Sequence, residues 1–327
     1  MYNVQIIGTG SYAPINVMKN SDITQFVETS DEWISNRIGI KERRISTGEG
    51  TTDLSVEAAK AAIESANISP KDIDLIVVGT CTPDNFIPST ACLIQREIGA
   101  VNSTCFDLSA ACTGFIYGIS VATQFIRTGQ NKTVLVIGAE TLSRGVDWTD
   151  RGTCVLFGDG AGAAILTRAE NEEQGVISIY TGADGNGAEF LEYPAVPLKN
   201  TFVEEVEENN SIITMQGGEV FKFAVKIIVE CIEKVLQDSD YSIEDIDYIV
   251  PHQANMKIID VAAKKLGIDK EKFFMNISKY GNTSGASIPL ALDEMEKANM
   301  LKKGDKIIMV GFGGGLTYGA VLINWNK

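Results

Sequence analysis

The sequence has only one histidine, His252, in 327 residues. Zinc sites that need several histidine ligands, and catalytic centres that need two histidines, are therefore excluded within one subunit. The sequence also has no Cys-x-x-Cys motif, since no two of its six cysteines have that spacing. We therefore expect no metal site, and we expect most of the thiols to be small buried hydrophobic groups.

The sequence also lacks the segments that would direct it to a membrane. It contains no uncharged run of about 18 apolar residues, which predicts no transmembrane helix. The first eight residues contain no basic segment followed by an apolar one, so we expect no signal peptide. The 43 acidic residues outnumber the 28 basic ones, and the net charge of −15 disfavours unspecific binding to nucleic acids. These features predict a cytoplasmic protein that binds neither membranes nor nucleic acids.

Two apolar segments recur at a shift of 173 positions. Residues 72–77 recur as residues 245–250, and residues 134–138 recur as residues 307–311. Each segment is a short β-branched run of the kind that forms a buried strand. Two matches at one offset, close to half the chain, indicate an internal duplication.

Apolar residues at helical spacing predict helices between these strands. The clearest helices are expected at Leu54–Ala66, Ser89–Ile98, Thr113–Ile126, Val220–Leu236 and Asn255–Leu266. The alternation of strands and helices predicts an α/β fold in which helices cover buried sheets. We predict two similar halves, residues 1–170 and 171–327, and a solvated acidic loop at residues 203–210.

Two glycine-rich segments follow predicted strands. Gly8-Thr9-Gly10 is similar to a dinucleotide-binding fingerprint, but Pro14 follows where the motif needs a helix that opens onto the phosphates. We therefore exclude a Rossmann site. The second segment, 311–315, predicts a tight turn whose bare backbone N–H groups can approach a ligand closely.

Cys112 lies between the predicted strand Thr104–Leu108 and the helix that follows it. A thiol at the start of a helix lies in the positive field of the helix dipole, which lowers its pKa and favours the thiolate. None of the other cysteines has this placement as clearly. On placement alone, Cys112 fits a nucleophile and a packed core cysteine about equally well.

The second half of the chain supplies two polar partners. His252 follows the repeated strand, at the carboxyl end where α/β proteins gather their sites. Asn282 lies in a loop before a helix, and the shift of 173 positions places Cys112 on the nearby Gly285. All three polar groups are thus expected at equivalent strand ends of two related halves, which favours catalysis.

The motifs around these residues resemble one family of enzymes. Ala110-Ala111-Cys112-Thr113-Gly114, His252-Gln253-Ala254-Asn255 and Gly281-Asn282-Thr283-Ser284 are similar to the motifs of β-ketoacyl-acyl-carrier-protein synthase III. The resemblance covers essentially the whole chain and implies a thiolase-like fold with duplicated αβαβα layers. It also implies a catalytic triad of Cys112, His252 and Asn282. The single histidine separates the chain from the elongating synthases, which are Cys-His-His enzymes.

The resemblance implies further site residues. The oxyanion hole would use the backbone of Cys112 and of Gly314. Coenzyme A and its pantetheine would be bound by Trp33, Arg37, Arg151, Gly217, Phe221, Ala254 and Asn255. Carrier-protein docking would use Lys222, Lys257, Lys264 and Lys265. The acyl pocket would be formed by Ile87, Leu142 and Phe312. Many members have Phe-Pro-Ser where this chain has Ile87-Pro88-Ser89, and that Phe reaches the acyl pocket of the partner subunit.

The implied reaction joins an acyl-CoA primer to malonyl-acyl-carrier protein through an acyl-Cys112 intermediate. It needs no metal and no bound redox cofactor, and the resemblance implies a homodimer. Three alternatives stay open. They are a related condensing enzyme of specialised metabolism, a Cys-His-Asn thioester hydrolase, and a non-catalytic acyl-CoA binder or thiol redox sensor. Papain-like hydrolases share the chain order of the three residues, but their Cys-Gly-Ser-Cys-Trp signature is absent here.

Overall fold

The computed structural model describes residues 1–169, 174–203 and 211–327. The strands are β1 (Val4–Tyr12), β2 (Val17–Lys19), β3 (Glu42–Arg44), β4 (Leu75–Gly79), β5 (Thr104–Leu108), β6 (Thr133–Thr141), β7 (Asp159–Arg168), β8 (Gly175–Ala183), β9 (Leu191–Glu192), β10 (Thr214–Met215), β11 (Tyr248–Pro251), β12 (Lys306–Gly313) and β13 (Thr317–Asn324). The α-helices are α1 (Asn20–Ile23), α2 (Asp31–Ile38), α3 (Thr51–Ala66), α4 (Thr90–Ile98), α5 (Gly114–Arg127), α6 (Gly217–Gln237), α7 (Met256–Leu266), α8 (Ile277–Tyr280) and α9 (Ser287–Lys297). The 3-10 helices are η1 (Pro70–Asp72), η2 (Ala111–Thr113), η3 (Leu142–Gly145), η4 (Gly185–Phe190), η5 (Ile243–Asp245), η6 (Lys270–Lys272) and η7 (Ser284–Ala286).

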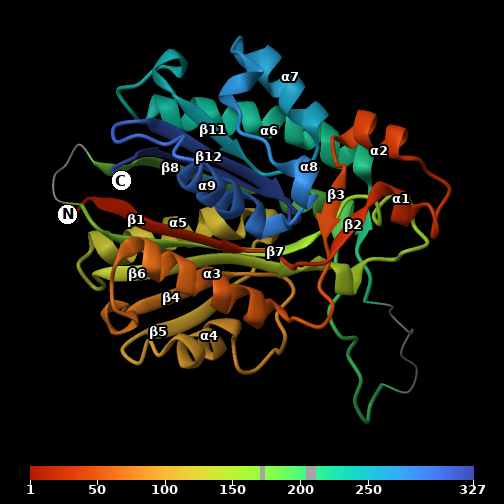
Figure 1. Ribbon diagram of the computed structural model, residues 1–327, viewed down its shortest axis with the longest axis horizontal. Coiled ribbons are helices and arrows are strands. Elements are labelled where there is room, and N and C mark those ends of the chain that lie inside the picture. The colour runs from red at the N-terminus through yellow and green to blue at the C-terminus, as the bar shows by residue number, and fades with distance from the viewer. Residues whose placement is uncertain (170–173, 204–210) are drawn as a thin grey trace.

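Two mixed β-sheets and three layers of helices alternate through the molecule (Figure 1). Helices α5 and α9 lie between the sheets, α3 and α4 cover the outer face of the first sheet, and α6 and α7 cover the second. The central apolar cluster contains residues of both sheets and of both central helices, such as Phe115 of α5 and Leu292 of α9. This arrangement confirms the predicted layered α/β fold.

The two sheets share one strand order. The first sheet runs β1-β7-β6-β4-β5, and the second runs β8-β13-β12-β11. Within the described residues of the second half, an isolated bridge between Ile249 and Phe273 takes the place of β5. The shared order confirms the internal duplication. The boundary between residues 170 and 171 and most of the acidic stretch, residues 204–210, lie outside the described residues, so those two predictions stay predictions.

The helix limits follow local capping signals. Ser89 caps α4, and its side chain accepts a hydrogen bond from the Cys92 backbone N–H. Gly99 ends α4 with φ = +73°, in the left-handed region that glycine adopts without a Cβ clash. Asn255 caps α7, and Gly267 ends it in the same way. These two helices are confirmed with their predicted ends.

The repeated strands begin later than predicted. The sequence pattern placed their starts at Asp72 and Asp245, whereas β4 begins at Leu75 and β11 at Tyr248. Asp72 accepts a hydrogen bond from the Ser69 N–H at 2.9 Å, and Asp245 accepts one from the Ser242 N–H at 2.8 Å. These capping contacts hold the acidic residues in 3-10 turns before the strands.

The first glycine motif has a packing role. Gly8 and Gly10 lie within β1, beneath α3. A Cβ built on Gly10 would lie 2.3 Å from the Ala58 carbonyl oxygen of α3, so only glycine allows the strand to approach the helix this closely. The segment forms no phosphate-binding loop, in agreement with the exclusion of a Rossmann site.

Candidate active site

Cys112 lies in η2, between β5 and α5, and only 5% of its surface is exposed. The preceding Ala111 has φ = +44°, in the left-handed region that residues with a Cβ rarely adopt. Such strain concentrates at functional sites. Gly313, the last residue of β12, packs against this turn, because a Cβ there would lie 2.8 Å from the Cys112 backbone nitrogen. The second glycine motif therefore brings β12 to the thiol.

His252 follows β11 directly and is almost fully buried. Its backbone N–H donates to the Val310 carbonyl oxygen at 2.8 Å, which ties it to β12. The ring Nδ1 lies 2.7 Å from Ser287 Oγ, and the ring packs edge-on against Phe312 with centroids 5.3 Å apart. Burial lowers the pKa of His252 to about 3, so the imidazole is neutral near pH 7.

Asn282 lies just before η7 and is also buried. Its backbone N–H donates to the Leu156 carbonyl oxygen at 2.9 Å. Its side-chain oxygen accepts a hydrogen bond from the Ser284 N–H at 2.9 Å. Because the carboxamide oxygen faces Ser284, its NH₂ group points the other way and can donate to a substrate.

The 3-10 helix η7 connects the three predicted residues. Ser284 of η7 and Cys112 of η2 line one cavity, and these two 3-10 helices are in contact. The Ser284 N–H donates to the Asn282 side-chain oxygen. Ser287 Oγ donates to the Ser284 carbonyl oxygen at 2.8 Å and also contacts His252. Hydrogen bonds thus link His252 and Asn282 through Ser284 and Ser287, and η7 contacts the 3-10 helix that carries Cys112.

The expectation that the helix dipole lowers the pKa of Cys112 is wrong. Burial raises the pKa of this thiol to about 12, the hydrogen bond with Ser284 lowers it, and the nearby charge of Glu140 raises it further. Desolvation of the buried sulfur is the largest cause of this shift.

A cavity of about 300 Å³ opens beside Cys112. It is lined by Cys81, Ser109, Ala110, Ala111, Cys112, Leu142, Phe157, Leu191, Glu192, Tyr193, Ile213, Ser284, Gly314, Gly315 and Thr317. Leu142, expected in the acyl pocket, and Gly314, expected in the oxyanion hole, line this cavity. Phe312, also expected in the acyl pocket, packs on His252 instead. Ile87 is 89% exposed and does not line the cavity of its own chain.

Several lining residues escaped the sequence analysis. Leu191, Tyr193 and Ile213 come from short or irregular segments without a motif. Their only signal was an apolar or aromatic side chain in a polar stretch. Glu140 also escaped notice, although it is fully buried at the end of β6 and its charge acts on Cys112.

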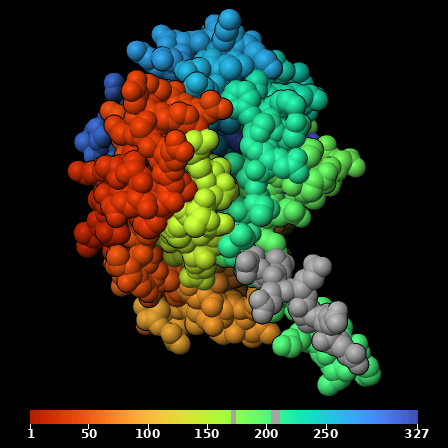
Figure 2. All heavy atoms as spheres, turned by 90° about the vertical axis from the view of Figure 1, so that its right-hand side faces the viewer, coloured from red at the N-terminus to blue at the C-terminus, as the bar shows by residue number. Residues whose placement is uncertain are grey.

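A second cavity, of about 390 Å³, lies beside α2. It is lined by Ser30, Glu32, Trp33, Asn36, Arg37 and Lys257. The guanidinium carbons of Arg37 and Arg151 lie 5.4 and 5.1 Å from the centre of the Trp33 ring. Figure 2 shows the face where the first helices in red, the segment around residue 150 in yellow-green and α7 in blue meet. Trp33, Arg37 and Arg151, the residues expected near an adenine, therefore lie next to one another.

The remaining predicted residues lie on α6, α7 and the segment before α7. Gly217 begins α6, and a Cβ built on it would lie 3.6 Å from Met215 Cε. Phe221 and Ala254 pack at the edge of the apolar cluster under this helix. Asn255 caps α7 by accepting a hydrogen bond from the Lys257 N–H at 2.9 Å. Lys264 and Lys265 lie in the last turn of α7, and Lys222 pairs with Glu219 at 2.7 Å.

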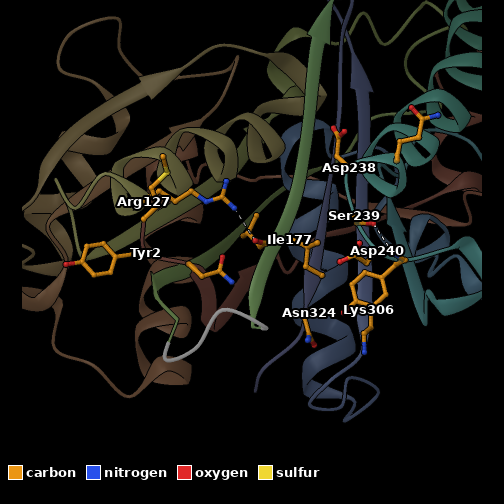
Figure 3. Close-up of a pocket in the computed structure, with 13 residues that line it drawn as sticks. Tyr2, Arg127, Ile177, Asp238, Ser239, Asp240, Lys306 and Asn324 are labelled. Atoms are coloured by element: carbon orange, nitrogen blue, oxygen red, sulfur yellow. Dashed lines mark hydrogen bonds between the residues drawn. The ribbon is translucent and has the colours of Figure 1, made fainter.

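A wider polar groove of about 910 Å³ lies elsewhere, between the chain start and the end of α6. Figure 3 shows Arg127 and Tyr2 on one side of it and Asp238, Asp240 and Lys306 on the other. None of Cys112, His252 and Asn282 lines it, so we place no chemistry there.

In the described part of the chain, no helix is long and apolar enough to cross a membrane. The same residues contain no group of three or more His, Cys, Asp or Glu side chains suited to a metal ion.

Comparison with known proteins gives consistent results. Residues 106–185 match the family model described as 3-oxoacyl-[acyl-carrier-protein (ACP)] synthase III, and residues 236–325 match the model of its C-terminal part. The chain is 59% identical over 326 residues to beta-ketoacyl-[acyl-carrier-protein] synthase III of Clostridium novyi, with complete coverage of both chains.

Solved structures agree in fold. The synthase III of Aquifex aeolicus is 48% identical with a TM-score of 0.92, covering 98% of this chain and all of that one. The priming β-ketosynthase of the R1128 polyketide pathway has the same TM-score at 33% identity, covering 100% of this chain and 97% of that one. The chain therefore belongs to the 3-oxoacyl-[acyl-carrier-protein] synthase III family and has its thiolase-like fold.

Proposed function

We propose that this chain catalyses the decarboxylative condensation of an acyl-CoA primer with malonyl-acyl-carrier protein. The products are a 3-ketoacyl-carrier protein, coenzyme A and carbon dioxide. The observation that carries this proposal is a buried site in a member of this family: Cys112 lines a cavity together with Ser284, and Ser284 and Ser287 link Asn282 to His252 by hydrogen bonds.

Cys112 acts as the nucleophile on the primer thioester. Its thiol lines the 300 Å³ cavity, which has room for a short acyl chain among Leu142, Leu191 and Ile213. The oxyanion formed during the attack lies against the backbone N–H groups of Cys112 and Gly314. Coenzyme A then leaves, and the acyl group stays on the sulfur.

His252 and Asn282 act on malonyl-carrier protein. Their N–H groups donate to the thioester carbonyl and stabilise the enolate that forms as carbon dioxide leaves. A neutral imidazole has one N–H, so donation from Nε2 requires that Nδ1 be the accepting nitrogen. Ser287 Oγ, 2.7 Å from Nδ1, supplies that hydrogen bond when its hydroxyl turns to the ring from the Ser284 carbonyl oxygen, 2.8 Å away. The enolate attacks the acyl group on Cys112 and releases the product.

The substrates fit separate parts of the surface. The adenine of acyl-CoA stacks between Trp33 and Arg151, near Arg37, and the pantetheine passes Gly217, Phe221, Ala254 and Asn255. The acidic carrier protein docks on Lys222, Lys257, Lys264 and Lys265, a basic set on a protein of net charge −15. The protein works in the cytoplasm as a homodimer in which Ile87, exposed in the single chain, enters the acyl pocket of the partner subunit. The reaction balances without a metal or a bound redox cofactor.

The alternatives are weaker. A role in specialised metabolism has support from the similarity to a priming β-ketosynthase, but that identity of 33% is below the 59% shared with a synthase III. A Cys-His-Asn hydrolase is disfavoured because the family models and relatives that match this chain are synthases. A binder or redox sensor would not need a buried, neutral histidine whose ring is held by Ser287.

Peptide mapping after incubation with acetyl-CoA tests the proposal. We expect one acetyl group per chain, on Cys112. The other five cysteines serve as internal controls, and Cys112→Ser should take up no stable label and lose condensation, because an alcohol is a far poorer nucleophile near neutral pH. A label on Cys81 or on any other cysteine would contradict the assignment.

A further inference from the structure

Arg43 is a buried cation that the proposed reaction leaves unused. It lies in β3, and its side chain is fully buried. In the residues that the structure describes, no carboxylate forms an ion pair with it, and its buried Nε has no hydrogen-bond partner. Burying a guanidinium without a carboxylate is costly, so this residue needs a reason to persist.

Neutral oxygens from three segments bind the Arg43 guanidinium. Nη1 donates to Asn20 Oδ1 at 2.9 Å and to the carbonyl oxygen of Met18 at 3.2 Å. Nη2 donates to the carbonyl oxygen of Val155 at 2.8 Å. Burial lowers the pKa of Arg43 to about 10, so the group is still charged near pH 7. One cation thus connects Asn20 to Val155, which is far away in the sequence.

The connection through Asn20 leads to α2, the helix that carries Trp33. Asn20 Nδ2 donates to Asp31 Oδ1 at the start of α2 and to the carbonyl oxygen of Ile40 just after its end, each at 2.8 Å. Asn20 is itself buried, so water does not replace its bond to Ile40. One carboxamide therefore holds both ends of the helix, and its oxygen is bound to Arg43.

The connection through Val155 leads to Arg151. A backbone hydrogen bond of 3.0 Å closes the turn 150–154, which carries Arg151 and is followed directly by Val155. The Arg151 side chain is exposed, and its guanidinium carbon lies 5.1 Å from the centre of the Trp33 ring. Arg43 thus links, through buried atoms, the two segments that present Trp33 and Arg151.

Other contacts between these segments fix their relative placement less well. Ile34 of α2 and Val155 share an apolar cluster, but apolar contacts have no preferred direction. Arg151 Nη1 donates to the carbonyl oxygen of Glu28 at 3.1 Å, but this bond is exposed, and exchange with water makes it weak. The planar fork of a guanidinium orients two acceptors at once. Arg43 therefore supplies a buried and directional link.

We propose that Arg43 and Asn20 are positioning residues that set the placement of Trp33 relative to Arg151, and with it the affinity for a nucleotide base. This inference rests on the proposed function, since it concerns the nucleotide end of acyl-CoA. Both residues are buried and act through α2 and the turn 150–154. Their loss should therefore weaken only those ligands that carry the nucleotide.

Arg43→Lys is the variant that tests the fork. A Cβ built on Gly281 would lie 3.1 Å from Arg43 Cβ, so the Arg43 stem packs beside the turn that leads to Asn282. Lysine keeps the charge and an aliphatic stem there, but its single ammonium lacks the fork that binds Asn20 and Val155 together. The substitution thus removes the link with little change in packing.

Titration calorimetry with coenzyme A measures the effect without turnover. The Kd of Arg43→Lys should rise about two- to fivefold, the scale of one exposed cation–π contact. The KM for acetyl-CoA should rise by the same factor. The KM for acetyl-pantetheine, which has no nucleotide, and kcat with either substrate should stay within about twofold of the wild type.

A double variant tests whether Arg43 acts through the stacking residue. Trp33→Ala removes the ring that Arg43 is proposed to place. In that background, Arg43→Lys should raise the Kd for coenzyme A by less than about twofold, because coupled residues are not additive. Fully additive effects of the two substitutions would contradict the inference.

Two further variants serve as support and control. Asn20→Ala cuts only the connection to α2 and should give the same selective rise, so it tests the link even if Arg43→Lys folds poorly. Arg127→Lys is the matched control, because the Arg127 guanidinium also donates to a backbone carbonyl, that of Val176 at 3.2 Å, and lines the separate polar groove. This variant should bind coenzyme A as the wild type does.

Two results would overturn the positioning role. One is a wild-type Kd for coenzyme A in folded Arg43→Lys or Asn20→Ala. The other is an equal rise of KM for acetyl-CoA and acetyl-pantetheine, or a loss of kcat with both, which would mean a general structural role. Failure of the wild type to bind coenzyme A would instead contradict the proposed function.

Discussion

His252 should make the protein less stable as the pH falls below 6.5. Burial lowers its pKa to about 3, whereas in the unfolded chain it returns to the ordinary value of 6.5. Between these values the unfolded state binds a proton that the folded state does not, so acid favours unfolding. At pH 5 the unfolded histidine is almost fully protonated. The free energy of unfolding should therefore fall by about 2 kcal/mol from this residue between pH 7.5 and pH 5.

The variant His252→Gln isolates this contribution. Burial raises the pKa values of Glu140 and Asp159, and these acids stabilise the folded state as the pH falls, so the wild-type curve alone mixes opposite effects. Both acids are present in wild type and variant and cancel in their difference. His252 is the only histidine, so no other imidazole interferes.

Urea unfolding at pH 7.5 and pH 5, at matched protein concentrations, measures the effect. The difference in free energy of unfolding between wild type and His252→Gln should decrease by about 2 kcal/mol at the lower pH. An unchanged difference would show that His252 titrates as it does in water. A larger difference at pH 5 would show that His252 is charged in the folded protein. Either result would refute the claim that His252 acts as a neutral hydrogen-bond donor.

Three further predictions concern catalysis. His252→Ala and Asn282→Ala should lose malonyl decarboxylation by on the order of 10²–10³ while Cys112 still acylates, and an equal loss of both steps in rapid-quench assays would contradict this division. Trp33→Ala should raise KM for acetyl-CoA by a few-fold through the lost stacking, but it should leave KM unchanged for an acyl-pantetheine that lacks the nucleotide. Ile87→Phe should lower kcat/KM for isobutyryl-CoA relative to acetyl-CoA by several-fold, because each buried methylene is worth roughly 0.8 kcal/mol. Equal ratios in both proteins would show that position 87 does not shape the pocket.

Local signals predicted most of the fold. Ser89 and Gly99 fix both ends of α4 through a cap and a left-handed glycine, and both are visible in the sequence. The first residues of the strands were harder to predict. Asp72 directly precedes an apolar run, but its side chain caps a 3-10 turn by accepting a hydrogen bond from the Ser69 N–H. The shift of 173 positions predicted that Cys112 and Asn282 lie at equivalent strand ends. This prediction came from the repeat in the sequence and required no knowledge of tertiary contacts.

Long-range surroundings were not predictable in this way. The raised pKa of Cys112 comes from burial by β12 and η7, which lie more than 170 positions along the chain. Glu140 lies near the end of a buried strand, where an acidic residue is usually expected to be exposed. The donors that bind it come from residues 80–82 and from Ser284. Only the packed structure shows which donors surround this carboxylate.

Single-turnover discharge of the acyl-enzyme tests the central claim most directly. Acetyl-Cys112 enzyme is isolated, mixed with malonyl-carrier protein or with buffer alone, and followed by intact mass. We expect loss of the acetyl group only with malonyl-carrier protein, with one 3-ketoacyl-carrier protein formed per acetyl group lost. Discharge to free acetate at the same rate in buffer alone would contradict the condensing function and would identify a thioester hydrolase.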